Sequence, residues 1–312
     1  MKYTARIEDS VTGTARDDQA VEIGKEGIRL GGTFLDYALL SMLRPINHRV
    51  ILTKMDGSEI TISMLGHSFD GFWDELMGSF GKRSADSLFI EEELLMSCEG
   101  EYALPVSENG RGMISLYPDA VCILPESSHA VRIPLCFTDD IRQEGYLIHI
   151  HMRTGESYTI GKMGFDTMPF AERCIKQAGI TKAKREKLLK GLETRPIFTE
   201  KGLFRTKQED EYWLAAYGTN TCAVELVTND AAATYLYRFD DRTLFTYRLE
   251  EAMEAVGSHR EIIFLAGDQL ADKPLYQMAI HRSAAVRFLR SCSAGRIIHN
   301  ASHQEKLQEF LK

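Results

Sequence analysis

Two histidines, His149 and His151, lie two residues apart in the segment Tyr146-Leu-Ile-His-Ile-His-Met. Alternate residues of a β-strand point to the same face, so a strand here carries both imidazoles on one side. An H-x-H pair is a reasonable start for a Zn²⁺ or other transition-metal site, but such a site needs at least one more ligand, which the sequence does not place. The alternative is that the isoleucines of the segment face the core and the histidines face solvent. A metal-dependent hydrolase built on this pair is therefore one candidate function.

A second group of residues that could bind a ligand consists of four arginines, Arg282, Arg287, Arg290 and Arg296. Ser283 can cap a helix that carries Arg287 and Arg290 on one face, where like charges three residues apart repel by a few tenths of a kcal/mol. A bound anion would relieve this repulsion through charge-assisted bonds from the guanidinium groups. The alternative is pairing with acidic residues or simple solvation. An anion or nucleic-acid binding site at these arginines is therefore a second candidate function.

Catalytic motifs are absent from the sequence: it has no nucleophile elbow, P-loop, dinucleotide fingerprint or helical H-E-x-x-H pattern. The six cysteines show no C-x-x-C spacing, and several lie in apolar runs where a reduced thiol behaves as a small hydrophobe. We therefore expect no catalytic residue and no cofactor, and an enzyme is the less favoured class.

The segment that carries the histidine pair belongs to an internal duplication of the sequence. Residues 35–77 align without gaps with residues 133–175, at an offset of 98. Identical pairs are Arg44 with Arg142, Gly57 with Gly155, Thr61 with Thr159, Ile62 with Ile160, Gly66 with Gly164 and Phe72 with Phe170. A repeat at a fixed offset indicates two copies of one supersecondary unit.

Each copy has the pattern of a β-hairpin followed by an amphipathic helix. Asp56-Gly57 and Thr154-Gly155 separate β-rich segments, which is a strong hairpin signal. The segments 34–43 and 131–137 add one further expected strand to each copy. Apolar residues at helical spacing then predict a closing helix, for which Gly81 and Gly179 are the expected ends.

The two copies, over about residues 20–180, resemble the pleckstrin-homology-like superfold. The resemblance implies a bent antiparallel sheet closed by a C-terminal helix, and binding of lipids, peptides or proteins more often than catalysis. Lipid-binding members carry several basic residues between the first strands, where this chain offers mainly Lys25 and Arg29, or Arg132. The expected fold class is α+β, with a first module at residues 1–95 and a second at 96–192 that includes a basic linker helix.

A third α+β domain is expected at residues 193–312. Strands are predicted at 222–228, 233–239 and 261–265, with a turn at Asn229-Asp230 and a helix capped by Asp240 or Asp241. A capping box is predicted at Ser302. The domain resembles a C-terminal unit of uncharacterised bacterial proteins, through the strings Ala233-Thr-Tyr-Leu-Tyr-Arg, Arg260-Glu-Ile-Ile-Phe-Leu and Gly295-Arg-Ile-Ile-His. That resemblance implies no activity.

Composition narrows the function classes further. The chain has 37 basic and 45 acidic residues, a net charge of −8, which makes a general nucleic-acid coating role unlikely. No apolar run reaches the roughly 18 residues of a membrane span, and no export signal follows the first methionine. Scattered cysteines suit a reducing cytoplasm. The leading hypothesis is a non-catalytic scaffolding protein that binds another protein through a sheet edge or a helix groove.

Overall fold

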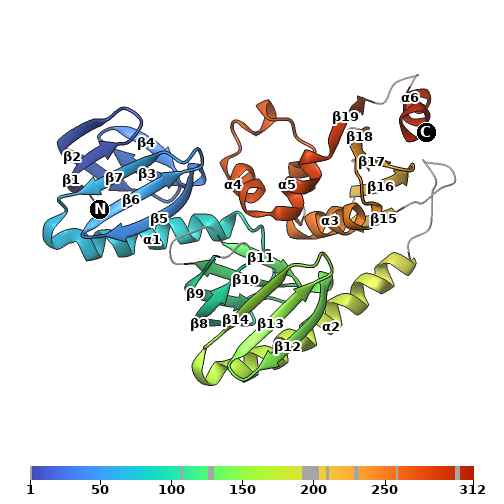
Figure 1. Ribbon diagram of the computed structural model, residues 1–312, viewed down its shortest axis with the longest axis horizontal. Coiled ribbons are helices and arrows are strands. Elements are labelled where there is room, and N and C mark those ends of the chain that lie inside the picture. The colour runs from blue at the N-terminus through green and yellow to red at the C-terminus, as the bar shows by residue number, and fades with distance from the viewer. Residues whose placement is uncertain are drawn as a thin grey trace.

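The computed structural model describes residues 2–105, 108–125, 130–191, 204–208, 211–227, 232–257, 259–298 and 303–312. The chain is α+β, with three antiparallel sheets accompanied by helices (Figure 1). We call residues 2–86 module 1, residues 96–191 module 2, and the residues from 204 onward the C-terminal unit. Within the described residues, no helix is long and apolar enough to cross a membrane.

Module 1 is an open seven-stranded sheet followed by one helix. Its strand order is β4-β3-β2-β1-β7-β6-β5. Its elements are β1 (Lys2–Asp9), β2 (Thr14–Ile23), β3 (Gly27–Leu30), β4 (Thr33–Asp36), β5 (Leu40–Ile46), β6 (Arg49–Lys54), β7 (Glu59–Ser63) and α1 (Phe69–Asp86). The apolar face of α1 is buried against the sheet, with Phe72, Leu76 and Phe80 fully buried.

Module 2 repeats this architecture. Its strand order is β11-β10-β9-β8-β14-β13-β12. This is the order of module 1, with β8 in the place of β1, β9 in the place of β2, and so on to β14 in the place of β7. Its elements are β8 (Met96–Ala103), β9 (Asn109–Leu116), β10 (Ala120–Pro125), β11 (Val131–Pro134), β12 (Thr138–Glu144), β13 (Leu147–Met152), β14 (Ser157–Gly161) and α2 (Thr167–Gly191). Phe170 and Cys174 of α2 close its core.

The duplication predicted from the sequence is confirmed, and it extends to irregular features. From β4 to the start of α1, every element recurs 98 residues later with the same bounds. The register of β5 against β6 shifts between Leu40 and Met42, and that of β12 against β13 shifts between Thr138 and Asp140. The hairpin glycines Gly57 and Gly155 adopt φ of 84° and 87°, a backbone conformation that other residues rarely adopt.

Two details of the predicted modules are wrong. The segments 34–43 and 131–137 are not single strands, because 3₁₀ turns at Tyr37–Leu39 and Leu135–Phe137 interrupt them. The helices also continue past Gly81 and Gly179. A helical glycine costs only about 1 kcal/mol relative to alanine, so the apolar face and the favourable residues that follow keep both helices intact.

The C-terminal unit is a five-stranded sheet in sequence order with helices beside it. Its elements are β15 (Phe204–Gln208), β16 (Glu211–Tyr217), β17 (Thr221–Val227), β18 (Ala232–Arg238), α3 (Arg242–Ala255), α4 (Pro274–Arg282), α5 (Ala284–Ser291), β19 (Ser293–Ile298) and α6 (His303–Leu311). The predicted caps hold: Asp241 Oδ1 accepts from Leu244 N at 2.9 Å, and Ser283 Oγ accepts from Val286 N at 3.2 Å.

One predicted strand of this unit is wrong. Residues 261–265 lie mostly in a 3₁₀ turn, Arg260–Ile263, in which the consecutive residues Ile262 and Ile263 are both buried. A short apolar run does not distinguish a strand from a compact turn enclosed on several sides. The Asn229-Asp230 turn and the start of the capping box at Ser302 lie outside the described residues.

The C-terminal unit contacts both modules (Figure 1). Met278 of α4 is fully buried within the core of module 1. Phe89, in the connection between the modules, stacks on His259 with ring centroids 4.3 Å apart. The helix α3 packs against β11 of module 2. These contacts bring three distant parts of the chain to one junction.

Candidate ligand-binding site

A cavity of about 140 Å³ lies at this junction, between module 2 and the C-terminal unit. Module 2 contributes Arg132 and Pro134 of β11, with Glu156 and Tyr158 at the start of β14. The C-terminal unit contributes charged residues from three helices, Glu251, Arg282 and Arg287. We call this space the junction cavity. Its polar groups come from segments that lie far apart in the sequence.

Arg282 ends α4 and lies in the wall of the cavity. One of its guanidinium nitrogens, Nη1, donates to Ser84 O at 3.2 Å and also to Ser87 Oγ. Both acceptors are uncharged. Burial lowers the pKa of Arg282, the positive charge of Arg132 lowers it further, and only Cys122 acts in the opposite direction. Its guanidinium is therefore held in the wall by neutral groups, without a carboxylate partner among the described residues.

Arg132 is neutralised within the protein. Its Nη2 forms an ion pair with Asp119, and its Nη1 donates to Leu88 O at 3.3 Å and to Ala255 O at 3.4 Å. These bonds join β11 to the connection between the modules and to α3. The residue that the family resemblance offered as a basic lipid contact thus binds protein groups.

Arg287 lies in the first turns of α5, whose cap residue Ser283 also lines the cavity. It is exposed and donates to Ile280 O at 3.4 Å. Burial lowers the pKa of Arg287, and the charge of Glu156 raises it. Glu156 itself already binds another arginine, so it does not fully balance Arg287.

Acidic residues also line the cavity, and we call Glu156 and Glu251 its acidic wall. Arg248 of α3 forms a bidentate ion pair with Glu156, with Nη1–Oε2 at 2.9 Å and Nη2–Oε1 at 3.0 Å. The same Nη1 lies 3.2 Å from Oε2 of Glu251. Burial raises the pKa of Glu251 to about 7, despite the charge of Arg248, and the charge of Glu156 adds to the rise. Two carboxylates thus share one guanidinium.

The other two arginines of the predicted cluster do not line the junction cavity. Arg290 donates to Ile262 O at 2.7 Å and so holds the 3₁₀ turn against α5. Arg296 is exposed on β19, opposite Tyr235 of β18. The structure therefore brings Arg282 and Arg287 to one cavity and leaves Arg290 and Arg296 elsewhere.

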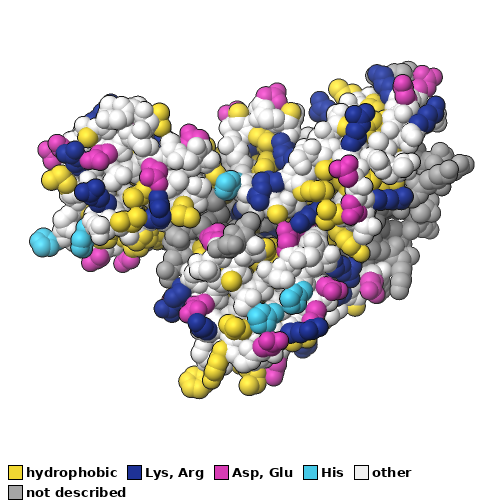
Figure 2. All heavy atoms as spheres, viewed as in Figure 1, with side chains coloured by type: hydrophobic (Ala, Val, Ile, Leu, Met, Phe, Trp, Pro, Cys, Tyr) yellow, Lys and Arg dark blue, Asp and Glu magenta, His cyan; other side chains and the backbone are white. Residues whose placement is uncertain are grey.

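The histidine pair lies on the outer face of module 2, where Figure 2 shows neighbouring histidine side chains. His149 Nδ1 lies 3.1 Å from Thr159 Oγ1, and His151 Nδ1 lies 2.8 Å from Ser157 Oγ. Ile148 and Ile150, which alternate with the histidines along β13, are buried. Among the described residues, no group of three or more His, Cys, Asp or Glu is arranged to hold a metal ion, so the pair gains no further ligand there.

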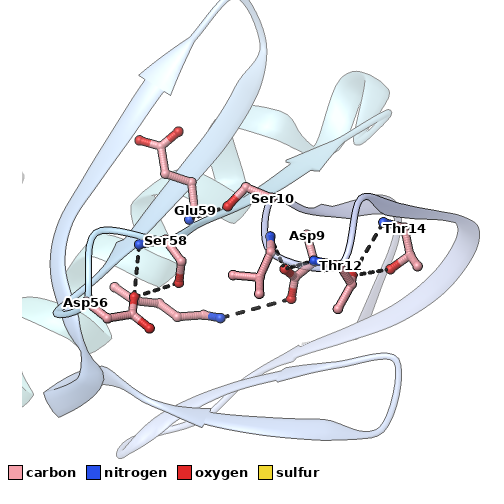
Figure 3. Close-up of polar contacts among 9 residues, drawn as sticks. Asp9, Ser10, Thr12, Thr14, Asp56, Ser58 and Glu59 are labelled. Atoms are coloured by element: carbon pink, nitrogen blue, oxygen red, sulfur yellow. Dashed lines mark hydrogen bonds and ion pairs between the residues drawn. The ribbon is translucent and has the colours of Figure 1, made fainter.

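Loops at one end of module 1 carry carboxylates that are occupied by local bonds (Figure 3). Asp9 Oδ1 accepts from Val11 N at 2.8 Å, and Asp56 Oδ1 accepts from Ser58 N at 2.9 Å. Ser10 Oγ accepts from Glu59 N at 2.8 Å and joins the two loops. The Ser10 hydroxyl thus joins the two loops, and backbone amides bind the aspartates within them.

The modules differ at the end where the loop before β13 meets the start of α2. In module 2, Tyr146, Phe165 and Met168 are exposed by 70%, 103% and 59%. Their counterparts at the 98-residue offset are His48, His67 and Asp70. Hydrophobic side chains gather at the lower end of module 2 in Figure 2, and histidines occupy the corresponding end of module 1. We call the three exposed residues the apolar tip.

The buried cysteines do not resemble nucleophiles. Burial raises the pKa of Cys122 and of Cys174 to about 12. A thiol with so high a pKa is almost fully protonated near neutral pH, and the thiolate is the reactive form.

Sequence reasoning placed two residues of the junction cavity, Arg282 and Arg287, and missed its acidic wall. A usable signal existed for part of it: Arg248 and Glu251 are three residues apart on a predicted helix, a spacing typical of ion pairs. Nothing local pointed to Glu156, which lies 92 residues before Arg248. Comparison with known proteins adds no assignment, because no family model and no curated protein matches the chain.

Proposed function

We propose that this chain is a non-catalytic binding protein that takes up a small anionic ligand in the junction cavity. The observation that carries the proposal is the pair Arg282 and Arg287. Both line one cavity, and neither forms an ion pair with a carboxylate among the described residues. Arg282 is partly withdrawn from water and has only neutral partners, while Arg287 is exposed, so an anion that accepts charge-assisted bonds from both guanidinium groups would be stabilised there.

The size of the cavity favours a small molecule over a nucleic acid. A cavity of about 140 Å³ compares with the engineered cavity of about 150 Å³ that accommodates benzene. It has room for about six non-hydrogen atoms. The net charge of −8 also opposes binding to a polyanion.

The modules themselves fit a binding role. We propose that both belong to the pleckstrin-homology-like superfold, a proposal supported by a seven-stranded antiparallel sheet and a closing helix in each. In this chain the modules would act as a frame, with Arg132, Glu156 and Tyr158 of module 2 forming one side of the ligand site.

The experiment is a thermal unfolding series at constant ionic strength with phosphate, propionate and β-alanine as probes. A ligand that binds only the native state stabilises it by about 2.7 kcal/mol at one hundred times its dissociation constant. We expect at least one probe to raise the unfolding midpoint of the wild type, and Arg287→Ala to reduce that rise. Arg296→Ala removes the same charge outside the cavity and should respond like the wild type. A wild type that responds to none of the probes, or an Arg287→Ala variant that responds fully, would refute the proposal.

A second candidate function, protein binding, is favoured by the apolar tip. Exposed aromatic residues and methionine are enriched in protein interfaces. We propose that the tip, rather than a sheet edge, is the contact surface for a protein partner. A photo-reactive residue at position 165 should give a discrete cross-linked product in cells, and one at the matched position 67 should not. Equal products at both positions, or none at 165, would contradict this candidate.

A further inference from the structure

The acidic wall of the junction cavity has one more negative charge than positive charge when both carboxylates are ionised. Glu156 has both oxygens bound to Arg248, and its Oε2 also accepts from Thr154 Oγ1 at 3.0 Å. Glu251 receives only one bond from Arg248, through Oε2 at 3.2 Å. The structure records no hydrogen bond to Glu251 Oε1 from the residues it describes. A cation entering the cavity would find this oxygen available.

The basic wall has the opposite imbalance. Arg132 is balanced by Asp119. Arg282 donates to a backbone carbonyl and a hydroxyl, and Arg287 donates to a backbone carbonyl. Two positive charges therefore line the cavity without a carboxylate of their own, on the side where α4 meets α5.

The rest of the lining is mainly apolar. It includes Leu104, Val131, Pro134, Val256 and Ala279. A compact inorganic anion would satisfy the arginines but would leave the carboxylate side unbalanced. A hydrocarbon chain with unlike charges at its two ends matches all three features of the cavity.

We infer that the ligand of the junction cavity is a small zwitterion, a short amino acid whose anionic group binds Arg282 and Arg287 and whose ammonium group binds Glu251. The inference rests on the proposed function and names its substrate class. A cavity of about 140 Å³ limits the ligand to about six non-hydrogen atoms, the size of β-alanine. The ammonium group would bind Glu251 Oε1 and add a second positive charge for the two carboxylates that share Arg248, which favours their ionised forms.

Isothermal titration calorimetry at pH 8 can test the inference with matched pairs of probes. Glycine, β-alanine and γ-aminobutyrate are each compared with the carboxylate that lacks the amino group, acetate, propionate and butyrate respectively. We expect at least one amino acid to bind the wild type at least tenfold more tightly than its partner. Glu251→Gln should remove most of that preference while leaving binding of the simple carboxylate in place. Arg287→Ala should weaken both members of the pair, and Arg296→Ala should weaken neither.

The possible outcomes separate this inference from the proposed function. If the simple carboxylates bind as tightly as the amino acids, or if Glu251→Gln leaves the preference unchanged, the zwitterion is refuted and the anion site stands. If no amino acid and no carboxylate binds, the zwitterion is refuted, and the anion site fails with it unless phosphate raises the unfolding midpoint of the wild type. Circular dichroism and the unfolding midpoint of each variant establish that it is folded before titration, so a loss of binding reports on the cavity.

Discussion

The ionisation of Glu251 should make the stability of the protein depend on pH, and this effect can be measured without a ligand. Replacing it by Gln keeps an oxygen acceptor for Arg248 Nη1, now 3.2 Å away, and removes the titrating proton. In the folded protein burial raises the pKa of Glu251 to about 7, from an ordinary value of 4.5. The folded state therefore holds this proton more tightly than the unfolded state does.

The sign and size of the effect follow from proton linkage. Between pH 4.5 and 7 the folded state binds the proton and the unfolded state does not, so the wild type loses stability as pH rises through this window. Raising the pKa from 4.5 to about 7 corresponds to about 3 kcal/mol, because each tenfold change in proton affinity is worth about 1.36 kcal/mol. The loss levels off as the pH rises above 7. Glu251→Gln does not suffer it, so the variant should be more stable than the wild type at pH 8 by up to about 3 kcal/mol.

The assay is urea unfolding of both proteins from pH 5 to pH 8.5, followed by circular dichroism. The difference in unfolding free energy should increase with pH from pH 5 and level off above about pH 7. Glu172→Gln, an exposed change on α2 with the same charge difference, provides the control and should show no such titration. A difference between Glu251→Gln and the wild type that does not vary with pH would refute the reasoning.

Three further substitutions and one labelling experiment test other parts of the structure. Asp241→Ala removes the cap of α3 and should lower the unfolding free energy by about 1 kcal/mol, measured by urea unfolding. Phe80→Ala leaves a cavity in the core of module 1 and should lower the unfolding free energy by about 3 to 5 kcal/mol in the same measurement. Arg248→Ala leaves Glu156 and Glu251 without their shared partner, and its unfolding midpoint should fall more at pH 8 than at pH 5.5, since Glu251 is protonated at the lower pH. Thiol labelling of the native protein should modify the partly exposed Cys292 before any of the five buried cysteines.

The sequence predicts the repeated half of the fold well, because its signals are local. The pairs Asp56-Gly57 and Thr154-Gly155 define hairpins through the backbone preference of glycine, and the helical spacing of apolar residues identifies α1 and α2. The missed features are those that tertiary packing decides. The turn at Tyr37–Leu39 looks like strand because its residues are apolar, but Tyr37 and Ala38 are buried beneath α1 and α4.

The candidate site was predictable only in part, for a related reason. The arginines of α4 and α5 stand out because like charges lie close in sequence. Their separation into different roles depends on contacts such as Arg282 with Ser84, 198 residues away, and Arg290 with Ile262. Glu156 and Glu251 become neighbours only because α3 packs on module 2. A charge pattern within one helix carries no information about a partner on another domain.

The burial of Met278 within module 1 bears on how the chain folds as it is made. Chains emerge from the ribosome at about 5 to 20 residues per second, and domains near the N-terminus generally fold first. Module 1 would therefore emerge with the place of Met278 in its core unfilled. The helix α4, which carries Met278, would fill this place only after module 2 and most of the C-terminal unit had been synthesised. Until then, apolar groups beside Tyr37 and Phe80 would be open to water or to a chaperone. Truncation before α4 should therefore leave a nascent product prone to aggregation, even though its entire first sheet is present.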